Sequence, residues 1–178
     1  MNAAWTDVAQ DAVKIGLGAV IGLLGNGLLA KRTRDHEIAD AKRQARKADF
    51  TEVERLLNTF RVEFSKFYDA LRNYQTAIQE SKDHERASIK HNLGIYKQIA
   101  ANALNDLVGV DSKLSLWGED RALKAFRKFS EAADTGLEEL WNLRESGTQG
   151  EFDEKTQKTF DLRNALYKEL GLIYQAIE

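Results

Sequence analysis

The apolar residues from Phe50 to Ile78 recur at alternating steps of three and four positions. Those that follow this spacing are Phe50, Val53, Leu57, Phe60, Phe64, Phe67, Leu71, Tyr74 and Ile78. Four uninterrupted heptads predict a helix that buries one apolar face. The chain has no proline, so the strongest helix breaker is absent from its whole length. A long helix is therefore the first element that the sequence predicts.

Three further segments show helical apolar spacing, over residues 85–109, 119–145 and 152–177. Four phenylalanines in the seam of the first segment are bulky for a two-stranded coiled coil, which favours several neighbouring helices. Segments of similar length with short connections predict an antiparallel up-down-up-down four-helix bundle over residues 50–178. We expect the fold class to be all-α.

Local signals predict where these helices begin and end. The run Ser146–Gly150 reads as a turn, and Thr148 and Glu151 have the spacing of a capping box. Asp49 and Glu52 have the same spacing, which indicates a helix restart or bend where the bundle begins. A break is expected over residues 109–118, which begin and end with glycine.

The stretch from Ile15 to Ala30 contains one polar side chain, that of Asn26. A helix without a polar face is buried either in protein or in lipid. Counted from Ala12 the stretch approaches the roughly 20 residues that cross a bilayer. Five glycines in a soluble core helix would each cost about 1 kcal/mol relative to alanine. We therefore interpret residues 12–30 as a transmembrane helix rather than a buried helix of a soluble domain.

Small residues on this helix predict contact between copies of the chain. Gly18 and Gly22 form a GxxxG motif, and Gly25 extends the same face. Such faces let helix backbones approach closely in lipid, so we expect a homo-oligomer. The same features allow an alternative hypothesis, a membrane-perturbing effector, holin-like or toxin-like, whose glycine-rich helix oligomerises in the bilayer.

Basic residues follow the apolar stretch and predict its orientation. Residues 31–49 form an expected helical stalk with seven basic and four acidic side chains. Its candidate lipid-facing residues are Lys31, Arg32, Arg34, Arg43, Arg46 and Lys47. Basic flanks stay in the cytoplasm, so the tail of residues 1–11 is expected outside and the bundle inside. The stalk is either solvated or held against anionic lipid.

The sequence shows no constellation typical of catalysis. Cysteine is absent, the three histidines form no Glu-x-x-His pair, and no glycine-rich phosphate loop follows a strand pattern. A surface metal site at His84 and His91 is the less favoured interpretation of those residues. The chain has a net charge of −2, which disfavours nucleic acid. We expect a non-enzymatic protein without metal, cofactor or small-molecule substrate.

The segment before Gly118 carries three large apolar residues, Leu114, Leu116 and Trp117. Such residues commonly tuck under the end of a bundle as part of its core. The alternative is contact with the bilayer interface or with a partner. The resulting hypothesis is a single-pass membrane protein that acts in the cytoplasm as an interaction, scaffold or tethering module for an unidentified protein partner.

Overall fold

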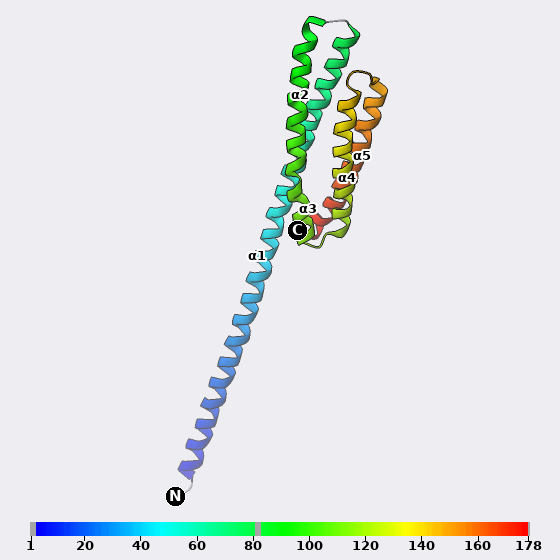
Figure 1. Ribbon diagram of the computed structural model, residues 1–178. Coiled ribbons are helices and arrows are strands. Elements are labelled where there is room, and N and C mark those ends of the chain that lie inside the picture. Colours follow the sequence, from blue (N-terminus) through cyan, green and yellow to red (C-terminus); the bar gives the residue numbers. More distant parts are fainter. Residues whose placement is uncertain (1–2, 81–82, 178) are drawn as a thin grey trace. The chain divides into compact units, whose positions relative to one another are not determined.

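The computed structural model describes the backbone of residues 3–80 and 83–177, and the side chains of residues 33–80 and 85–177. It contains the helices α1 (Ala3–Gln79), α2 (Asp83–Asp106), α3 (Val108–Leu116), α4 (Asp120–Leu143) and α5 (Gln149–Ile177), as Figure 1 shows. No strand occurs in the backbone so described. The predicted all-α fold class is confirmed.

The chain divides into two units, Met1–Ala45 and Arg46–Glu178. The sequence predicts a boundary after Asp49, four residues further along the chain. Helix α1 contributes residues to both units and continues through Asp49, so no new helix begins there. The Glu52 carboxylate pairs with Arg55 on the same helix instead of capping a helix start.

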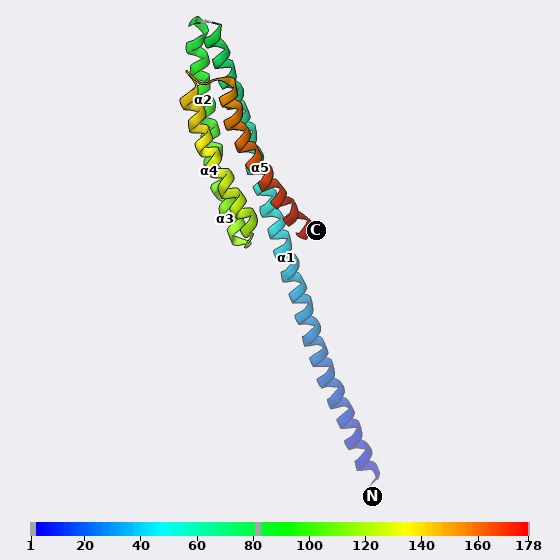
Figure 2. The ribbon, with the colours of Figure 1, turned by 90° about the vertical axis from the view of Figure 1, so that its right-hand side faces the viewer.

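The second unit is a helical bundle. Its part of α1 lies beside α2, α4 and α5 in both Figure 1 and Figure 2. The chain runs along α1, returns along α2, reverses into α4 and returns along α5 (Figure 1). Helix α3 lies in the connection between α2 and α4 and contacts both.

The apolar face of α1 forms the centre of the core, as its spacing predicts. All nine positions of the seam are buried except Ile78, which is half-buried against the core. Aromatic rings join this face to the other helices: the Phe60 and Phe129 centroids are 5.6 Å apart, and those of Phe64 and Phe160 are 6.3 Å apart. Both pairs meet edge to face, the arrangement that the ring quadrupole favours.

The structure corrects the expected break over residues 109–118. Residues from Val108 to Leu116 are helical, and the helical run is interrupted at Leu107 and again around Gly118, whose φ is 68°. Val110 and Leu114 are four residues apart and both buried, so this short helix has an apolar face of its own. A β-carbon at Gly109 would lie 3.5 Å from the Leu56 side chain, an ordinary van der Waals distance, so α3 packs next to α1 at this position.

Burial at two positions does not follow the apolar spacing. The spacing within residues 85–109 predicts Tyr96 on the buried face of its helix, but Tyr96 is exposed. Phe152, at the start of α5, is fully buried although its position next to a turn gives no periodic signal.

Within the searched part of the chain, whose side chains are described, no helix is apolar and long enough to cross a membrane. The predicted span at residues 12–30, including Gly18, Gly22 and Gly25, lies outside the described side chains.

Candidate functional site

The three apolar residues singled out near Gly118 have different surroundings. Leu114 is buried in the bundle core, and Trp117 is half-buried against it. Leu116 is 73% exposed at the last position of α3. Leu116 is therefore the member of this group that presents a large apolar surface to solvent.

A polar cluster joins α3 to α1 at this end of the bundle. The Trp117 indole donates to the Asp49 carboxylate, with Nε1 2.9 Å from Oδ2. The Lys113 ammonium donates to the other oxygen of Asp49. The hydrogen bond from Lys113, and then that from Trp117, hold the pKa of Asp49 below its usual value. The carboxylate therefore links the two helices in its ionised form.

Arg46, one of the predicted juxtamembrane basic residues, also belongs to this cluster. Its guanidinium pairs with Glu119 and lies 6.0 Å from the ring centroid of Trp117 and 5.9 Å from that of Phe50. Among the other predicted basic residues, Arg34, Arg43 and Lys47 are exposed, while Lys31 and Arg32 lie outside the described side chains.

A second polar cluster surrounds Glu145, where α4 ends. Its carboxylate accepts hydrogen bonds from the Tyr74 hydroxyl at 2.8 Å, Arg86 at 2.9 Å and Lys90 at 2.7 Å. Chiefly the bonds from Lys90 and Tyr74 lower the pKa of Glu145 to about 2. The cluster ties α1 and α2 to the end of α4. Because these partners are more than 50 residues from Glu145 in the chain, no local pattern in the sequence indicates it.

A third polar contact joins α1 to α5. The Tyr68 hydroxyl donates to Asp153, and the Gln149 amide donates to both at 3.0 and 2.8 Å. Burial, and then the hydrogen bond to Asp153, raise the pKa of Tyr68 to about 12. In all three clusters the carboxylate accepts several hydrogen bonds, which makes it a weak base. The arrangement suits fixing helices together better than moving protons.

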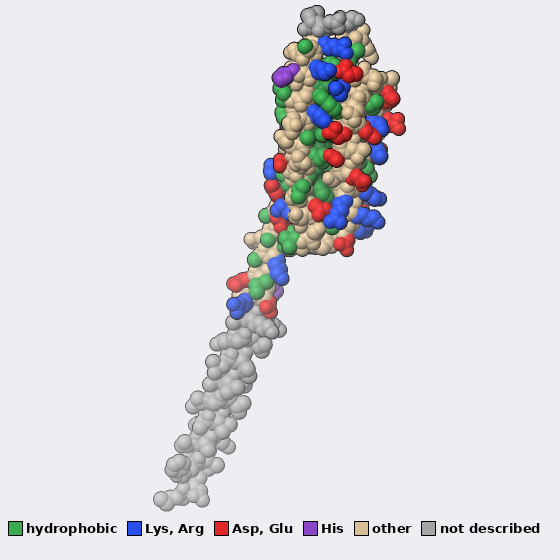
Figure 3. Space-filling model, viewed as in Figure 1, with side chains coloured by type: hydrophobic (Ala, Val, Ile, Leu, Met, Phe, Trp, Pro, Cys, Tyr) green, Lys and Arg blue, Asp and Glu red, His purple; other side chains and the backbone are tan. Residues whose placement is uncertain are grey.

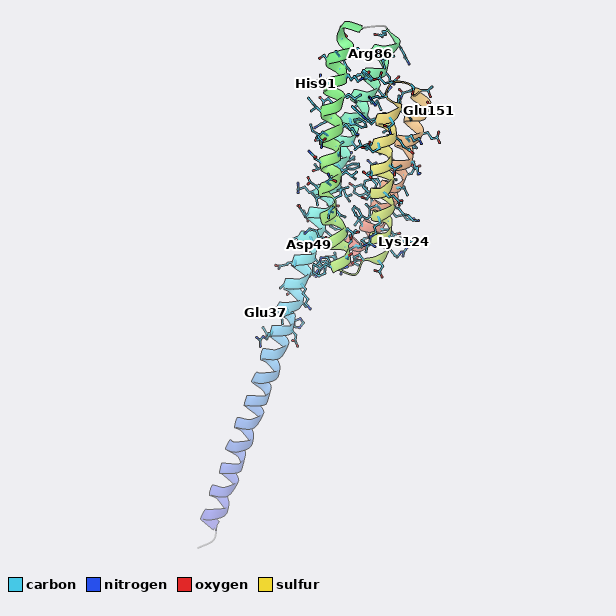
Figure 4. The ribbon with its side chains drawn as sticks, viewed as in Figure 1. Glu37, Asp49, Arg86, His91, Lys124 and Glu151 are labelled. Atoms are coloured by element: carbon cyan, nitrogen blue, oxygen red, sulfur yellow. The ribbon has the colours of Figure 1, made fainter. Side chains whose placement is uncertain are left out.

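No three side chains of His, Cys, Asp or Glu come together as a possible metal site in the described residues. His91 points away from the bundle on α2 (Figure 4), and the side chain of His84 is outside the described part. The expected lack of a metal or cofactor stays a prediction.

The surface that stands out is the outer face of α2. Ile95 is 46% exposed and Ile99 39% exposed, and Tyr96 lies beside them. Between residues 91 and 105 the only formally charged side chain is Lys97. That side chain turns back to α4, where it pairs with Glu138 at 2.8 Å and lies over Trp141.

Charged side chains gather elsewhere on the bundle. Helix α4, DRALKAFRKFSEAADTGLEELWNL, carries nine of them along its length. In Figure 3 the left-hand edge of the bundle, where Figure 1 places α2, is mostly tan and green, whereas blue and red side chains gather towards the right. Depletion of charge around exposed aliphatic and aromatic residues is typical of the centre of a protein interface. We treat this α2 face as the candidate functional surface. No protein-family model, curated protein or solved structure matches this chain.

Proposed function

We propose that this chain is a single-pass membrane protein whose bundle acts as a non-enzymatic interaction, scaffold or tethering module in the cytoplasm. The observation that carries the proposal is the apolar stretch from Ile15 to Ala30, followed at once by Lys31, Arg32 and Arg34. This order of residues is typical of a membrane span with a cytoplasmic basic flank. The exposed α2 face supports the interaction role, because it offers apolar surface with little charge.

In this proposal the anchor also brings copies of the chain together. Gly18, Gly22 and Gly25 would line the contact between two such helices in lipid. The helix continues from this segment into the bundle, since α1 runs from Ala3 to Gln79.

The anchor is tested by carbonate extraction of membranes from cells that express the full chain. We expect the chain to stay with the membrane pellet, and an Ile21→Asp/Leu24→Asp variant to move to the supernatant. Each charge at the centre of a span costs about 3 kcal/mol on insertion scales. The matched control, Leu116→Asp on the exposed end of α3, should remain in the pellet. Release of the unmodified chain without detergent would overturn the anchor.

Orientation is tested with single cysteines, because the natural chain has none. A membrane-impermeant maleimide should label Asn2→Cys in intact cells, and Ser146→Cys only after the membrane is opened. The reverse pattern would place the bundle outside. Leakage of dye from vesicles that contain the full chain would instead favour the membrane-perturbing alternative.

A further inference from the structure

The outer face of α2 carries a second helical seam, separate from the one that faces the core. Its positions follow steps of four and three: Ser88, Asn92, Ile95, Ile99, Asn102 and Asp106. All six side chains are exposed on the bundle surface. Steps of three and four that persist along one face are the spacing by which a helix packs against another helix. The buried residues Leu93 and Ala100 lie on a different face of α2, so the seam stays outside the core of the bundle.

The spacing of the seam, and the identity of its four inner residues, are the same in both directions along the helix. About Lys97 as midpoint, Ile95 mirrors Ile99, Asn92 mirrors Asn102, and Ser88 mirrors Asp106. In an antiparallel helix pair, each seam position faces its mirror position on the partner helix, which satisfies the two-fold symmetry of an isologous contact. We infer that the α2 helices of two copies of this chain pack antiparallel along this seam.

Each facing pair is chemically matched in that arrangement. The isoleucines bury one another at the centre, and the asparagine amides can donate to and accept from each other. The Asn102 oxygen already accepts from Gln98 at 3.0 Å, which holds its side chain beside the seam. At each end the Ser88 hydroxyl can donate to the partner's Asp106 carboxylate, a charge-assisted bond.

A parallel pair is less well matched. It would set the two Asp106 carboxylates against each other, and like charges at facing positions repel. The positions that flank the seam, including Tyr96 and Gln98, carry no charge and oppose neither direction. The charge of Asp106 therefore favours the antiparallel arrangement.

The contact is expected to be weak. From Ser88 to Asp106 the seam is about 27 Å long at about 1.5 Å per residue, and one helix stripe of that length makes a small interface. Antiparallel pairing places the Asp49 ends of the two bundles at opposite ends of the pair. This arrangement suits tethering better than side-by-side scaffolding. It therefore deepens the proposed function and rests on it.

Cysteine pairing tests the contact and its direction in the full chain, solubilised in mild detergent if needed. Asn92→Cys and Asn102→Cys variants are oxidised separately and as an equal mixture, with a size tag on one of them. In the mixture we expect disulfide dimers that contain one copy of each variant, at least tenfold more abundant than the homodimers that either variant forms alone. Homodimers of each separate variant that are as abundant as the mixed dimers would indicate parallel pairing and overturn the inference.

A matched control sets the background. Thr135→Cys is exposed on α4, away from the seam, and should not cross-link to Asn102→Cys. Cross-linking of Asn92→Cys with Asn102→Cys no higher than this background would also overturn the inference. The outcome does not depend on carbonate extraction, so failure of the anchor and failure of the α2 contact are distinguishable.

A second pair of variants measures the strength of the contact by sedimentation. Ile95→Gln/Ile99→Gln should raise the dimer dissociation constant of the bundle contact at least tenfold. These residues are partly exposed, so the variant should keep its helix content, which circular dichroism checks. Leu172→Gln, exposed on α5, is the control and should leave association unchanged. Unchanged association in the double variant contradicts the inference.

Discussion

The indole Nε1 of Trp117 donates to Oδ2 of Asp49 across 2.9 Å and joins the residue after α3 to α1. Lys113 donates to the same carboxylate, and the Arg46 guanidinium lies over the Trp117 ring. These contacts determine how the segment between α2 and α4 is held against the bundle. They also show that Trp117 is engaged by residues of its own chain.

Replacement of Trp117 should therefore lower the free energy of unfolding. We expect a loss of about 2 kcal/mol for Trp117→Ala, because a half-buried aromatic contact is removed. Trp117→Phe keeps a ring beneath Arg46 and should lose about 1 kcal/mol, the contribution of the hydrogen bond. Urea unfolding followed by circular dichroism measures both. Leu116→Ala, at an exposed position, should change stability by less than about 0.5 kcal/mol.

The capping box at the start of α5 should stabilise the protein measurably. The Thr148 amide donates to Glu151 at 2.7 Å, and the Glu151 amide donates back to the Thr148 hydroxyl at 3.3 Å. We expect Thr148→Ala to cost about 1 kcal/mol in thermal or urea unfolding. Thr135→Ala is exposed within α4 and should be neutral or slightly stabilising. Equal effects of the two substitutions would mean that the box contributes nothing.

Substitution of two glycines by alanine should change the free energy of unfolding in opposite directions. A β-carbon at Gly147 would lie 2.8 Å from Phe152 Cζ and 2.9 Å from the Leu143 carbonyl oxygen. Gly147→Ala is thus expected to destabilise the protein by about 2 kcal/mol through overpacking. Gly171, within α5, has nothing within 4 Å of its added β-carbon. Gly171→Ala should raise the free energy of unfolding by about 1 kcal/mol through helix propensity.

The Glu145 cluster should make stability depend on pH in the acid range. The pKa of Glu145 is about 2 in the folded protein, against 4.5 for an unperturbed glutamate. The stabilisation is therefore present above pH 4.5 and is lost as pH falls towards 2. Because the side chain is 35% exposed, solvent screens it, and we expect about 1 kcal/mol at pH 7.

Urea unfolding at several pH values checks this expectation. The difference between the natural chain and Glu145→Gln should shrink to near zero at pH 2. Glu131→Gln, exposed on α4, serves as the control for the loss of one carboxylate. A difference that stays constant between pH 7 and pH 2 would show that the Glu145 ion pairs do not stabilise the fold.

Features that repeat along the chain could be predicted from the sequence. The positions from Phe50 to Tyr74 are buried as their spacing predicts, because one helix turn brings residues three and four apart onto one face. The capping box of Thr148 and Glu151 is likewise confirmed, since both of its hydrogen bonds lie within one turn.

The sequence by itself determined the four long helical segments of the bundle and which face of α1 is buried, since neighbouring residues carry that information. Tertiary structure alone decided that Gly109 lies in a helix against Leu56, and that Asp49 meets Lys113 and Trp117. It also decided that Glu145 collects its donors from α1 and α2. These contacts depend on how far one helix is shifted and rotated against another. That register results from packing of the whole core, and no short stretch of sequence specifies it.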